Sequence, residues 1–325
     1  MAGGPTTPRL VIAAADAGSL GFVAAGYLTA EAFAGQLAQV RQSTATVGAN
    51  LFAPNPLPVD AAEFARYADA LQAEADVYGL DVRGQEPRED DDEWQAKIDV
   101  LLADPLPVVS FTFGIPSVAV ITALQKVGTR VLQTVTSVHE ARQAVAAGVD
   151  GLVVQASSAG GHSGTLTPRQ LPAAIPLPDL VAAVRAAVTV PIVAGGGVGG
   201  SGDVAAALRA GAEAVAVGTL LLRTPEAGTS APYRAALADP ARTETVITRA
   251  FTGRPARGLR NVFTDRYSEI APSGYPALHH LTRPIRRAAA EAGDPERINL
   301  WAGTGHRHIR EATTAEILTD LCAAL

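Results

Sequence analysis

Residues 151–164 of this chain read Gly151-Leu152-Val153-Val154-Gln155-Ala156-Ser157-Ser158-Ala159-Gly160-Gly161-His162-Ser163-Gly164. The first half is a short apolar and β-branched run, which is typical of a strand buried on both faces. The second half is a glycine-rich loop that carries one imidazole. Glycine lets the backbone adopt angles, and approach ligands closely, where a Cβ would forbid it. The stretch therefore predicts a buried strand that ends at a ligand site, with His162 at the edge of that site.

Strand and helix patterns alternate on both sides of this stretch. Apolar strand patterns cover residues 20–26, 47–52, 108–114, 130–135, 151–156, 191–197 and 214–219, and helical patterns cover 7–17, 30–42, 60–78, 94–103, 117–127, 137–148, 178–188 and 201–210. Apolar strands that alternate with helices indicate a parallel sheet covered by helices. Polar residues or glycines end nearly every strand, which favours a (β/α)8 TIM barrel over an open sheet. Seven strands are counted, so the first strand is expected to be truncated, with the missing one before residue 1.

Three regions are predicted along the chain. Residues 1–223 are expected to form the barrel. Residues 224–300 are rich in helical patterns, prolines and arginines and contain no strand pattern, which predicts a mainly helical insertion over the barrel mouth. Residues 301–325 are expected to return to the barrel and end in its last helix. The charged run at 83–93 is predicted to be a solvated loop or helix start rather than a metal site.

The composition excludes several classes of protein. The 325 residues are 48% hydrophobic with a net charge of −6, which argues against nucleic-acid binding. Apolar runs end well short of the ~20 residues that a membrane helix needs. The single cysteine, Cys322, excludes an internal disulfide and makes a reducing cytoplasm the simplest compartment. No histidine has zinc-ligand spacing with carboxylates, so no metal is predicted. The oligomeric state is left open, with a homo-oligomer among the alternatives.

Glycines follow two of the predicted strands, and amide side chains lie at the ends of three others. Together they predict a bound ligand that has both a phosphate and a heterocycle. Gly195-Gly196-Gly197 and Gly218-Thr219 follow the last two strand patterns, where this fold commonly holds a phosphate on backbone N–H groups. Asn50, Gln133 and Gln155 fall at other strand ends, and an amide suits the edge of a heterocycle. Each amide could instead be a structural group between strands, and the glycines could serve only tight turns. No Walker sequence and no GxGxxG after a first strand is present, which disfavours nucleoside triphosphates and a Rossmann domain.

His162 is the candidate catalytic residue. It is the only histidine on a strand-end loop of the predicted barrel, and an imidazole with a pKa near neutrality can exchange a proton with a reacting group. The other histidines are predicted to be structural or at the surface: His139, His279, His280, His306 and His308.

At these residues the chain resembles the nitronate monooxygenase family, the FMN-containing barrels once called 2-nitropropane dioxygenases. The similar stretches are Met1 to Pro5 with Thr7-Pro8, Val109 to Gly114, Gln155 to Gly164, Gly195 to Gly197 with Val217 to Thr219, Thr252 to Gly258, and Asn299 to Gly303. The similarity runs nearly end to end. Three residues depart from the usual family pattern, namely Ala156, Ser158 and Ala216.

The resemblance implies an FMN enzyme that oxidises an alkyl nitronate with O₂ to a carbonyl compound and nitrite, with His162 facing the nitronate or nitroalkane substrate. Together with the strand-end reasoning it predicts cofactor contacts at Met1, Ala2, Gly3, Asn50, Gln133, Gln155, Gly160, Gly161, Gly195, Gly196, Gly197, Ala216, Val217, Gly218 and Thr219. Three alternatives stay open: an FMN-dependent NAD(P)H reductase of quinones or enoyl thioesters, a flavin-binding module without catalysis, and an isomerase of phosphorylated metabolites without flavin.

Overall fold

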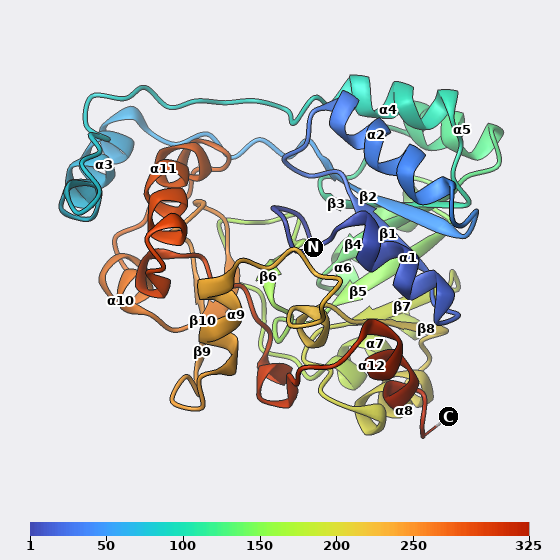
Figure 1. Cartoon of the computed structure of the whole chain (residues 1–325). Coiled ribbons are helices and arrows are strands. Elements are labelled where there is room, and N and C mark those ends of the chain that lie inside the picture. The colour runs from blue at the N-terminus through green and yellow to red at the C-terminus, as the bar shows by residue number, and fades with distance from the viewer. Residues whose placement is uncertain (325) are drawn as a thin grey trace.

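A computed structural model describes residues 1–324 of the chain, and its central element is a curled parallel sheet (Figure 1). The sheet has seven strands in the order β1-β2-β3-β4-β5-β7-β8. Their bounds are β1 Gly21–Ala24, β2 Val47–Ala53, β3 Val108–Phe113, β4 Arg130–Val135, β5 Gly151–Gln155, β7 Ile192–Gly195 and β8 Ala214–Ala216. All seven predicted strands are therefore confirmed. Within residues 1–324, β1 and β8 do not pair, and the strand expected before residue 1 stays a prediction.

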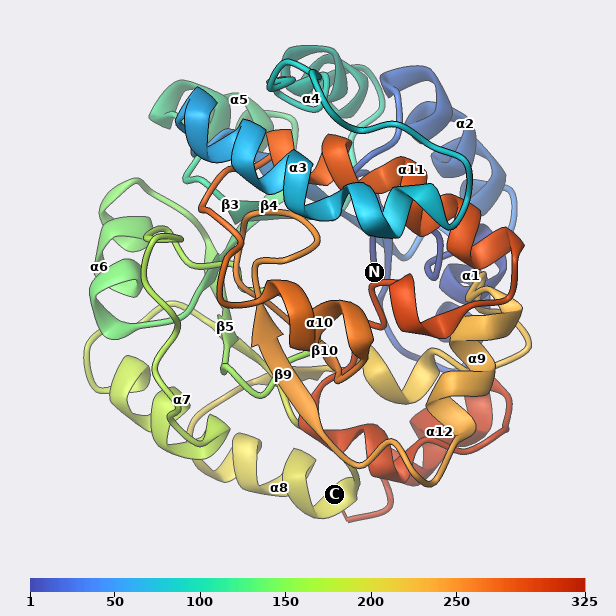
Figure 2. The same cartoon turned by 90° about the vertical axis from the view of Figure 1, so that its left-hand side faces the viewer.

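A ring of helices surrounds this sheet (Figure 2). The ring contains α1 Pro8–Asp16, α2 Ala30–Arg41, α4 Trp94–Ala103, α5 Val118–Lys126, α6 Val138–Ala146, α7 Leu177–Arg185, α8 Ser201–Arg209 and α12 Thr314–Leu321. Side-chain oxygens of Thr7, Thr29 and Ser137 cap the first turns of α1, α2 and α6, which satisfies helical N–H groups that would otherwise lack partners. The α/β barrel architecture predicted from the alternation is confirmed.

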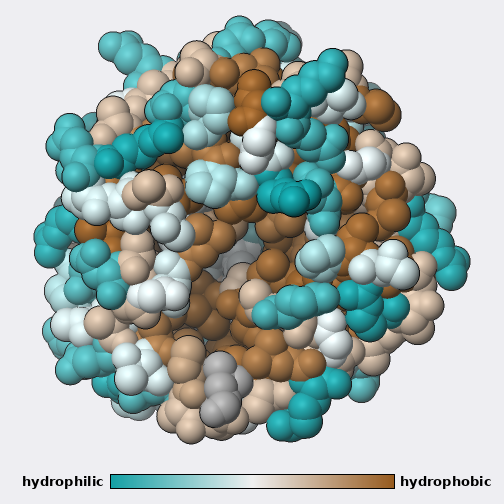
Figure 3. All heavy atoms as spheres, turned by 90° about the vertical axis from the view of Figure 1, so that its right-hand side faces the viewer, coloured by the Kyte–Doolittle hydropathy of each residue, from teal (hydrophilic) through white to brown (hydrophobic). Residues whose placement is uncertain are grey.

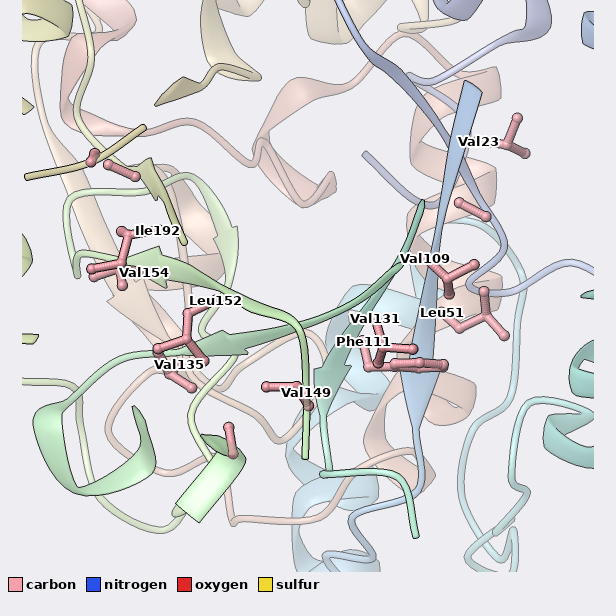
Figure 4. Packing of buried hydrophobic residues seen from close by; sticks show 14 of the residues in the cluster. Val23, Leu51, Val109, Phe111, Val131, Val135, Val149, Leu152, Val154 and Ile192 are labelled. Atoms are coloured by element: carbon pink, nitrogen blue, oxygen red, sulfur yellow. The ribbon is translucent and has the colours of Figure 1, made fainter. Parts of the chain in front are cut away.

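Along the strands, side chains alternate between the surrounding helices, where they are buried, and the barrel interior, where many are half-buried. Val109, Val131 and Leu152 belong to the core that packs against the helices (Figure 4). Residues one position away, such as Thr134 and Val153, line a cavity inside the barrel instead. Successive side chains of a strand point to opposite faces of the sheet. A shift of one residue along a strand therefore decides whether a side chain faces the helices or the cavity.

A second unit, here called the cap, covers one end of the barrel. It consists of α3 Ala61–Asp76, β6 Gly161–His162, α9 Ala231–Ala238, β9 Thr245–Thr248, β10 Ala256–Leu259, α10 Val262–Tyr267 and α11 Ala277–Glu291. Short 3-10 helices complete the chain at η1 Thr219–Leu221, η2 Pro295–Arg297 and η3 Thr304–His308. Figure 3 shows the face of the molecule away from the cap, where apolar side chains surround a central hollow.

The prediction that residues 224–300 contain no strand is wrong. Strands β9 and β10 pair antiparallel with each other, and β10 also pairs with β6 of the glycine-rich loop. Each of these strands has four residues or fewer, so none produces a detectable alternation, and the pairing of β6 with β10 joins positions about a hundred residues apart. Ala256 lies opposite His162 in this pairing, so the cap helps to fix the candidate catalytic residue.

The core of the cap includes a helix from the region predicted to be barrel. Phe64 and Leu71 of α3 pack in one apolar cluster with Phe263 of α10 and Leu278 of α11. The boundaries predicted at residues 223 and 300 stay a prediction, but the cap draws on residues from both sides of the first one.

The acidic run at 83–93 forms a loop without regular structure, as predicted, and at its end the half-buried Asp92 and the exposed Glu93 also have specific partners. Asp92 accepts a hydrogen bond from the Tyr27 N–H at 2.9 Å and pairs with the ammonium of buried Lys97 at 2.7 Å. Glu93 accepts from the N–H of Ala30 at the start of α2. The run therefore fastens the loop that precedes α2, which a count of charges does not reveal.

Candidate active site

A cavity of about 900 Å³ lies at the carboxyl ends of the strands, between barrel and cap. Its volume is at the upper end of the range for ligand pockets, which suits a large cofactor together with a small substrate. The predicted site residues that line it are Met1, Ala2, Gly3, Asn50, Gln155, Gly160, Gly161, His162, Gly195, Gly196, Gly197, Ala216, Val217, Gly218 and Thr219. The structure thus brings together every predicted site residue except one.

The exception is Gln133, which the structure does not bring to the cavity. Gln133 is fully buried, and its amide donates to the carbonyl of Thr134 at 3.1 Å. On β4 it shares the helix-facing side with Val131 and Val135, while its neighbour Thr134 faces the cavity. Neighbouring residues of a strand face opposite sides of the sheet, which explains why Gln133 is away from the cavity although Thr134 lines it. Gln133 is therefore dropped as a cofactor contact.

The glycine-rich strand ends form a cradle of backbone. The N–H groups of Gly196, Gly197 and Gly218 donate to no protein atom within residues 1–324. Gly197 has φ +77°, and a Cβ there would lie 2.8 Å from the Ser158 hydroxyl oxygen. A Cβ on Gly160 would lie 2.5 Å from the N atom of Gly303. N–H groups without protein acceptors that line one cavity, at positions where side chains are sterically excluded, are suited to hold a phosphate.

The two cavity amides are held by protein partners. The Asn50 amide nitrogen donates to the hydroxyls of Ser110 and Thr112 at 2.8 and 3.0 Å. The Gln155 amide donates to the carbonyl of His162 at 3.0 Å and accepts from the N–H of Gly164 at 2.7 Å. Gln155 therefore braces the loop that carries the imidazole, and a cofactor contact at this residue stays a prediction.

His162 lies in an aromatic pocket with a single polar partner. Its Nε2 is 2.9 Å from the hydroxyl of Thr252. The rings of Phe113, Tyr275 and Trp301 lie 5.5 to 5.9 Å from its centroid. Both His162 and Thr252 line the cavity, so the imidazole is fixed at one end and open to a ligand at the other.

The electrostatics of this pocket keep His162 neutral. Burial, followed by the nearby guanidinium groups of Arg254 and Arg286, lowers the pKa of His162 to about 3. The pKa near neutrality expected from the sequence is therefore wrong, because neither the burial of His162 nor the approach of the two arginines can be read from its position in the chain. A neutral imidazole can donate or accept a hydrogen bond but supplies no fixed charge.

A buried carboxylate anchors the chain that follows His162. Glu140, at the start of α6, accepts hydrogen bonds from the hydroxyl of Thr165 and the N–H of Leu166, each at 2.7 Å. The guanidinium of buried Arg254 donates to the carbonyl of Thr165 at 2.5 Å. Barrel and cap thus hold the same loop from two sides.

Sequence reasoning missed the residues that the cap contributes to the cavity. Arg283, Arg286 and Arg287 of α11 line it, and so does His279, which was predicted to be structural. The arginines follow helical spacing on one face of α11, but that signal does not say what the face covers. Thr252 and Trp301 lie within stretches that supported the family resemblance.

Within residues 1–324, no group of three or more His, Cys, Asp or Glu side chains is placed to hold a metal ion. In the same part of the chain, no helix combines the length and apolarity needed to cross a membrane.

Comparisons with known proteins agree with this geometry. The model of the nitronate monooxygenase family matches residues 1–324. A probable nitronate monooxygenase of Staphylococcus aureus (strain Newman) is 34% identical over 315 residues, covering 94% of this chain and 86% of that protein. A crystal structure of nitroalkane oxidase from Streptomyces ansochromogenes matches with a TM-score of 0.94 and 44% identity, covering 100% of this chain and 93% of that one. FabK from Thermotoga maritima matches with a TM-score of 0.75 and 26% identity, covering 99% of this chain and 89% of that chain. The family resemblance is confirmed: this chain belongs to the nitronate monooxygenase family of flavin-dependent oxidoreductases.

Proposed function

We propose that the protein is an FMN-dependent nitronate monooxygenase that oxidises alkyl nitronates with O₂ to carbonyl compounds and nitrite. The observation that carries this proposal is the composition of the cavity wall. Three arginines and two histidines line the cavity, and no aspartate or glutamate within residues 1–324 does. A cavity of this charge in a chain of net charge −6 favours anionic ligands, and a nitronate and a phosphate ester are both anions.

The cradle fits the phosphate of FMN. We assign the phosphate to the free N–H groups of Gly196, Gly197 and Gly218, beside the first turn of η1. The further contacts proposed for FMN are Met1, Ala2, Gly3, Asn50, Gln155, Gly160, Gly161, Gly195, Ala216, Val217 and Thr219. FMN would supply the electron transfer, since no protein side chain does so readily, and the chain supplies orientation and electrostatics.

The neutral state of His162 favours the nitronate over the neutral nitroalkane as substrate. A base whose conjugate acid has a pKa of about 3 is poorly matched to a carbon acid as weak as a nitroalkane. Thr252 holds Nε2, which leaves Nδ1 to meet the substrate. In this role His162 orients an anion that arrives already deprotonated.

The His162→Asn variant tests the role of the imidazole. We expect kcat/KM for ethylnitronate to fall at least about tenfold, as for the loss of one hydrogen bond to a charged group. The assay is steady-state O₂ consumption by the FMN-loaded enzyme, with nitroethane as the second substrate. Unchanged rates on both substrates would remove His162 from the mechanism.

Absorption spectroscopy tests the cofactor and separates the alternatives. Freshly purified protein is expected to be yellow, with FMN released on denaturation. Rapid anaerobic bleaching by NADH would favour a reductase of quinones or enoyl thioesters. Yellow protein inert toward nitronates, NADH and NADPH would indicate a binding module, and colourless protein that takes up no FMN would favour an isomerase. On the ground of its free cysteine, Cys322, we further propose that the enzyme works in a reducing cytoplasm.

A further inference from the structure

The arginines of the cavity wall come from one face of one cap helix. Arg283, Arg286 and Arg287 lie three and four positions apart on α11, and all three line the cavity. Arg287 is largely exposed and pairs with Glu291 at 2.9 Å. Arg286 is different, because its side chain is half-buried in the cavity wall.

Arg286 has only neutral hydrogen-bond partners within residues 1–324. Its Nε donates to the Thr282 hydroxyl at 3.1 Å, and Nη1 donates to Asn299 Oδ1 at 3.2 Å. Nη2 donates to the carbonyl of His279 at 2.9 Å and lies 3.3 Å from Nδ1 of the same residue. By contrast, the buried carboxylate of Glu74 elsewhere in the cap is paired with two arginines.

The position of Arg286 is fixed through His279. The imidazole of His279 stacks on Tyr27 with ring centroids 4.2 Å apart and an interplanar angle of 2°. The N–H of Tyr27 is in turn bonded to Asp92. A planar guanidinium held in this way is ready to meet a planar anion without losing side-chain freedom on binding.

A cation enclosed by protein without a counter-charge is costly unless a ligand supplies the opposite charge. Burial lowers the pKa of Arg286 to about 10, so the group remains protonated at neutral pH. His162 supplies no charge, and Arg254, the other buried cation near it, does not line the cavity. Arg286 is therefore the half-buried, permanently charged group that a ligand beside His162 would meet.

We propose that Arg286 is the specificity-determining residue that donates to an oxygen of the nitronate through the remaining N–H of Nη1, and that its charge makes the enzyme prefer this anion to the neutral nitroalkane. The inference rests on the proposed function for the identity of the substrate. The site itself, a planar oxyanion receptor on α11, rests on the contacts of Arg286 alone.

The test compares Arg286→Gln and Arg286→Lys with wild type in the FMN-loaded enzyme, using ethylnitronate and nitroethane. We expect Arg286→Gln to lower kcat/KM for the nitronate at least about 30-fold, as for truncation of a buried charge partner, and kcat/KM for nitroethane less than about threefold. Arg286→Lys keeps the charge but loses the planar guanidinium that Thr282, Asn299 and His279 hold in place, so an intermediate loss on the nitronate is expected. Arg260→Gln removes an exposed cap arginine paired with Glu244 and Asp265, and controls for net charge.

Nitrate, a planar oxyanion that cannot be oxidised, gives a readout independent of turnover. Isothermal titration at constant ionic strength is expected to detect nitrate binding to wild type and Arg260→Gln, with binding at least tenfold weaker in Arg286→Gln.

Equal losses of kcat/KM on both substrates, or unchanged nitrate affinity in Arg286→Gln, would overturn the proposal. If Arg286→Gln does not fold, the same criteria apply to Arg286→Lys, for which unchanged nitronate preference and unchanged nitrate affinity overturn it. If wild type oxidises no nitronate, the proposed function fails, while the nitrate titration still decides whether Arg286 receives an oxyanion.

Discussion

His162 shows how far a single residue can be understood before its surroundings are known. The glycine-rich loop after an apolar strand was enough to single it out, because that pattern marks the end of a buried strand. Its protonation state depends first on burial and then on Arg254 and Arg286, which lie about a hundred residues further along the chain. Local sequence gives the chemical type of a site residue, whereas distant residues set its pKa.

The lowered pKa of His162 predicts an acid-sensitive fold. Between about 3 and the ordinary value of 6.5, the unfolded state binds a proton that the folded state does not, so stability rises with pH over this window. Acidification from pH 7 to 5 should therefore cost about 2 kcal/mol through this residue. We expect His162→Asn to lose that part of the pH dependence in urea unfolding of the flavin-free protein. His279 is present in both proteins, so its contribution cancels, and equal pH slopes for the two would contradict the pKa of His162.

At the scale of elements, the order of strands and helices followed from the sequence, but the two faces of the strands did not. In an antiparallel sheet with one wet face, alternation tells inward from outward residues. Here both faces are buried, so β4 gives no such signal and Gln133 could not be told from Thr134. The strands β9 and β10 were missed for a related reason, since their pairing with β6 is a long-range contact between very short segments.

The backbone cradle at the end of β7 predicts that a single added methyl group at Gly197 weakens flavin binding. In Gly197→Ala the left-handed backbone costs about 1 to 2 kcal/mol, and the Cβ meets the hydroxyl oxygens of Ser158 and Thr304 at 2.8 and 3.0 Å. We expect the purified variant to lose bound flavin, measured as the ratio of visible to ultraviolet absorbance. Gly35→Ala is the matched control, because Gly35 lies within α2 with no heavy atom within 4 Å of its ideal Cβ. That control should keep its flavin and gain about 0.5 to 1 kcal/mol of stability; full flavin content in Gly197→Ala would contradict the role of the cradle.

Glu140, in the first turn of α6, is predicted to support both the stability of the fold and the activity of the enzyme. In Glu140→Gln one acceptor oxygen becomes a donor, which then faces either the donors of Thr136 or those of Thr165 and Leu166. We expect a loss of about 2 kcal/mol in the free energy of unfolding, because hydrogen bonds to a charged group are lost. We also expect lower kcat/KM for ethylnitronate, since the loop after His162 loosens. Glu269→Gln, at an exposed cap position, should change neither quantity; a Glu140→Gln variant with wild-type stability and activity would show that the carboxylate does not brace the loop.

At the scale of the whole molecule, barrel and cap are interleaved rather than joined end to end. The chain leaves the barrel after β2, contributes α3 to the cap, and returns to form α4 and β3 (Figure 1). The loop after β5 does the same through β6. The predicted boundary at residue 223 relied on a change of sequence pattern. That change shows where most of the cap residues begin, but it does not show that earlier segments such as α3 also belong to the cap.

This interleaving predicts that barrel and cap unfold together, and Glu74 of α3 is the residue to test it. Its buried carboxylate pairs with Arg297 and with Arg266 at 2.6 Å, and accepts from the Tyr267 hydroxyl at 3.0 Å. Burial raises the pKa of Glu74, but these donors outweigh it, so the pKa lies below its ordinary value.

Breaking such a network at one partner typically costs about 3 to 5 kcal/mol, and each kcal/mol lowers Tm by about 2 to 4 °C in proteins of 150–250 residues. We expect calorimetry of Glu74→Ala to give one transition shifted down by several degrees, with tryptophan fluorescence and far-ultraviolet circular dichroism changing at the same temperature. Two separate transitions, with the higher one still raised by added FMN, would mean that the barrel folds without the cap and that α3 is only loosely attached to it.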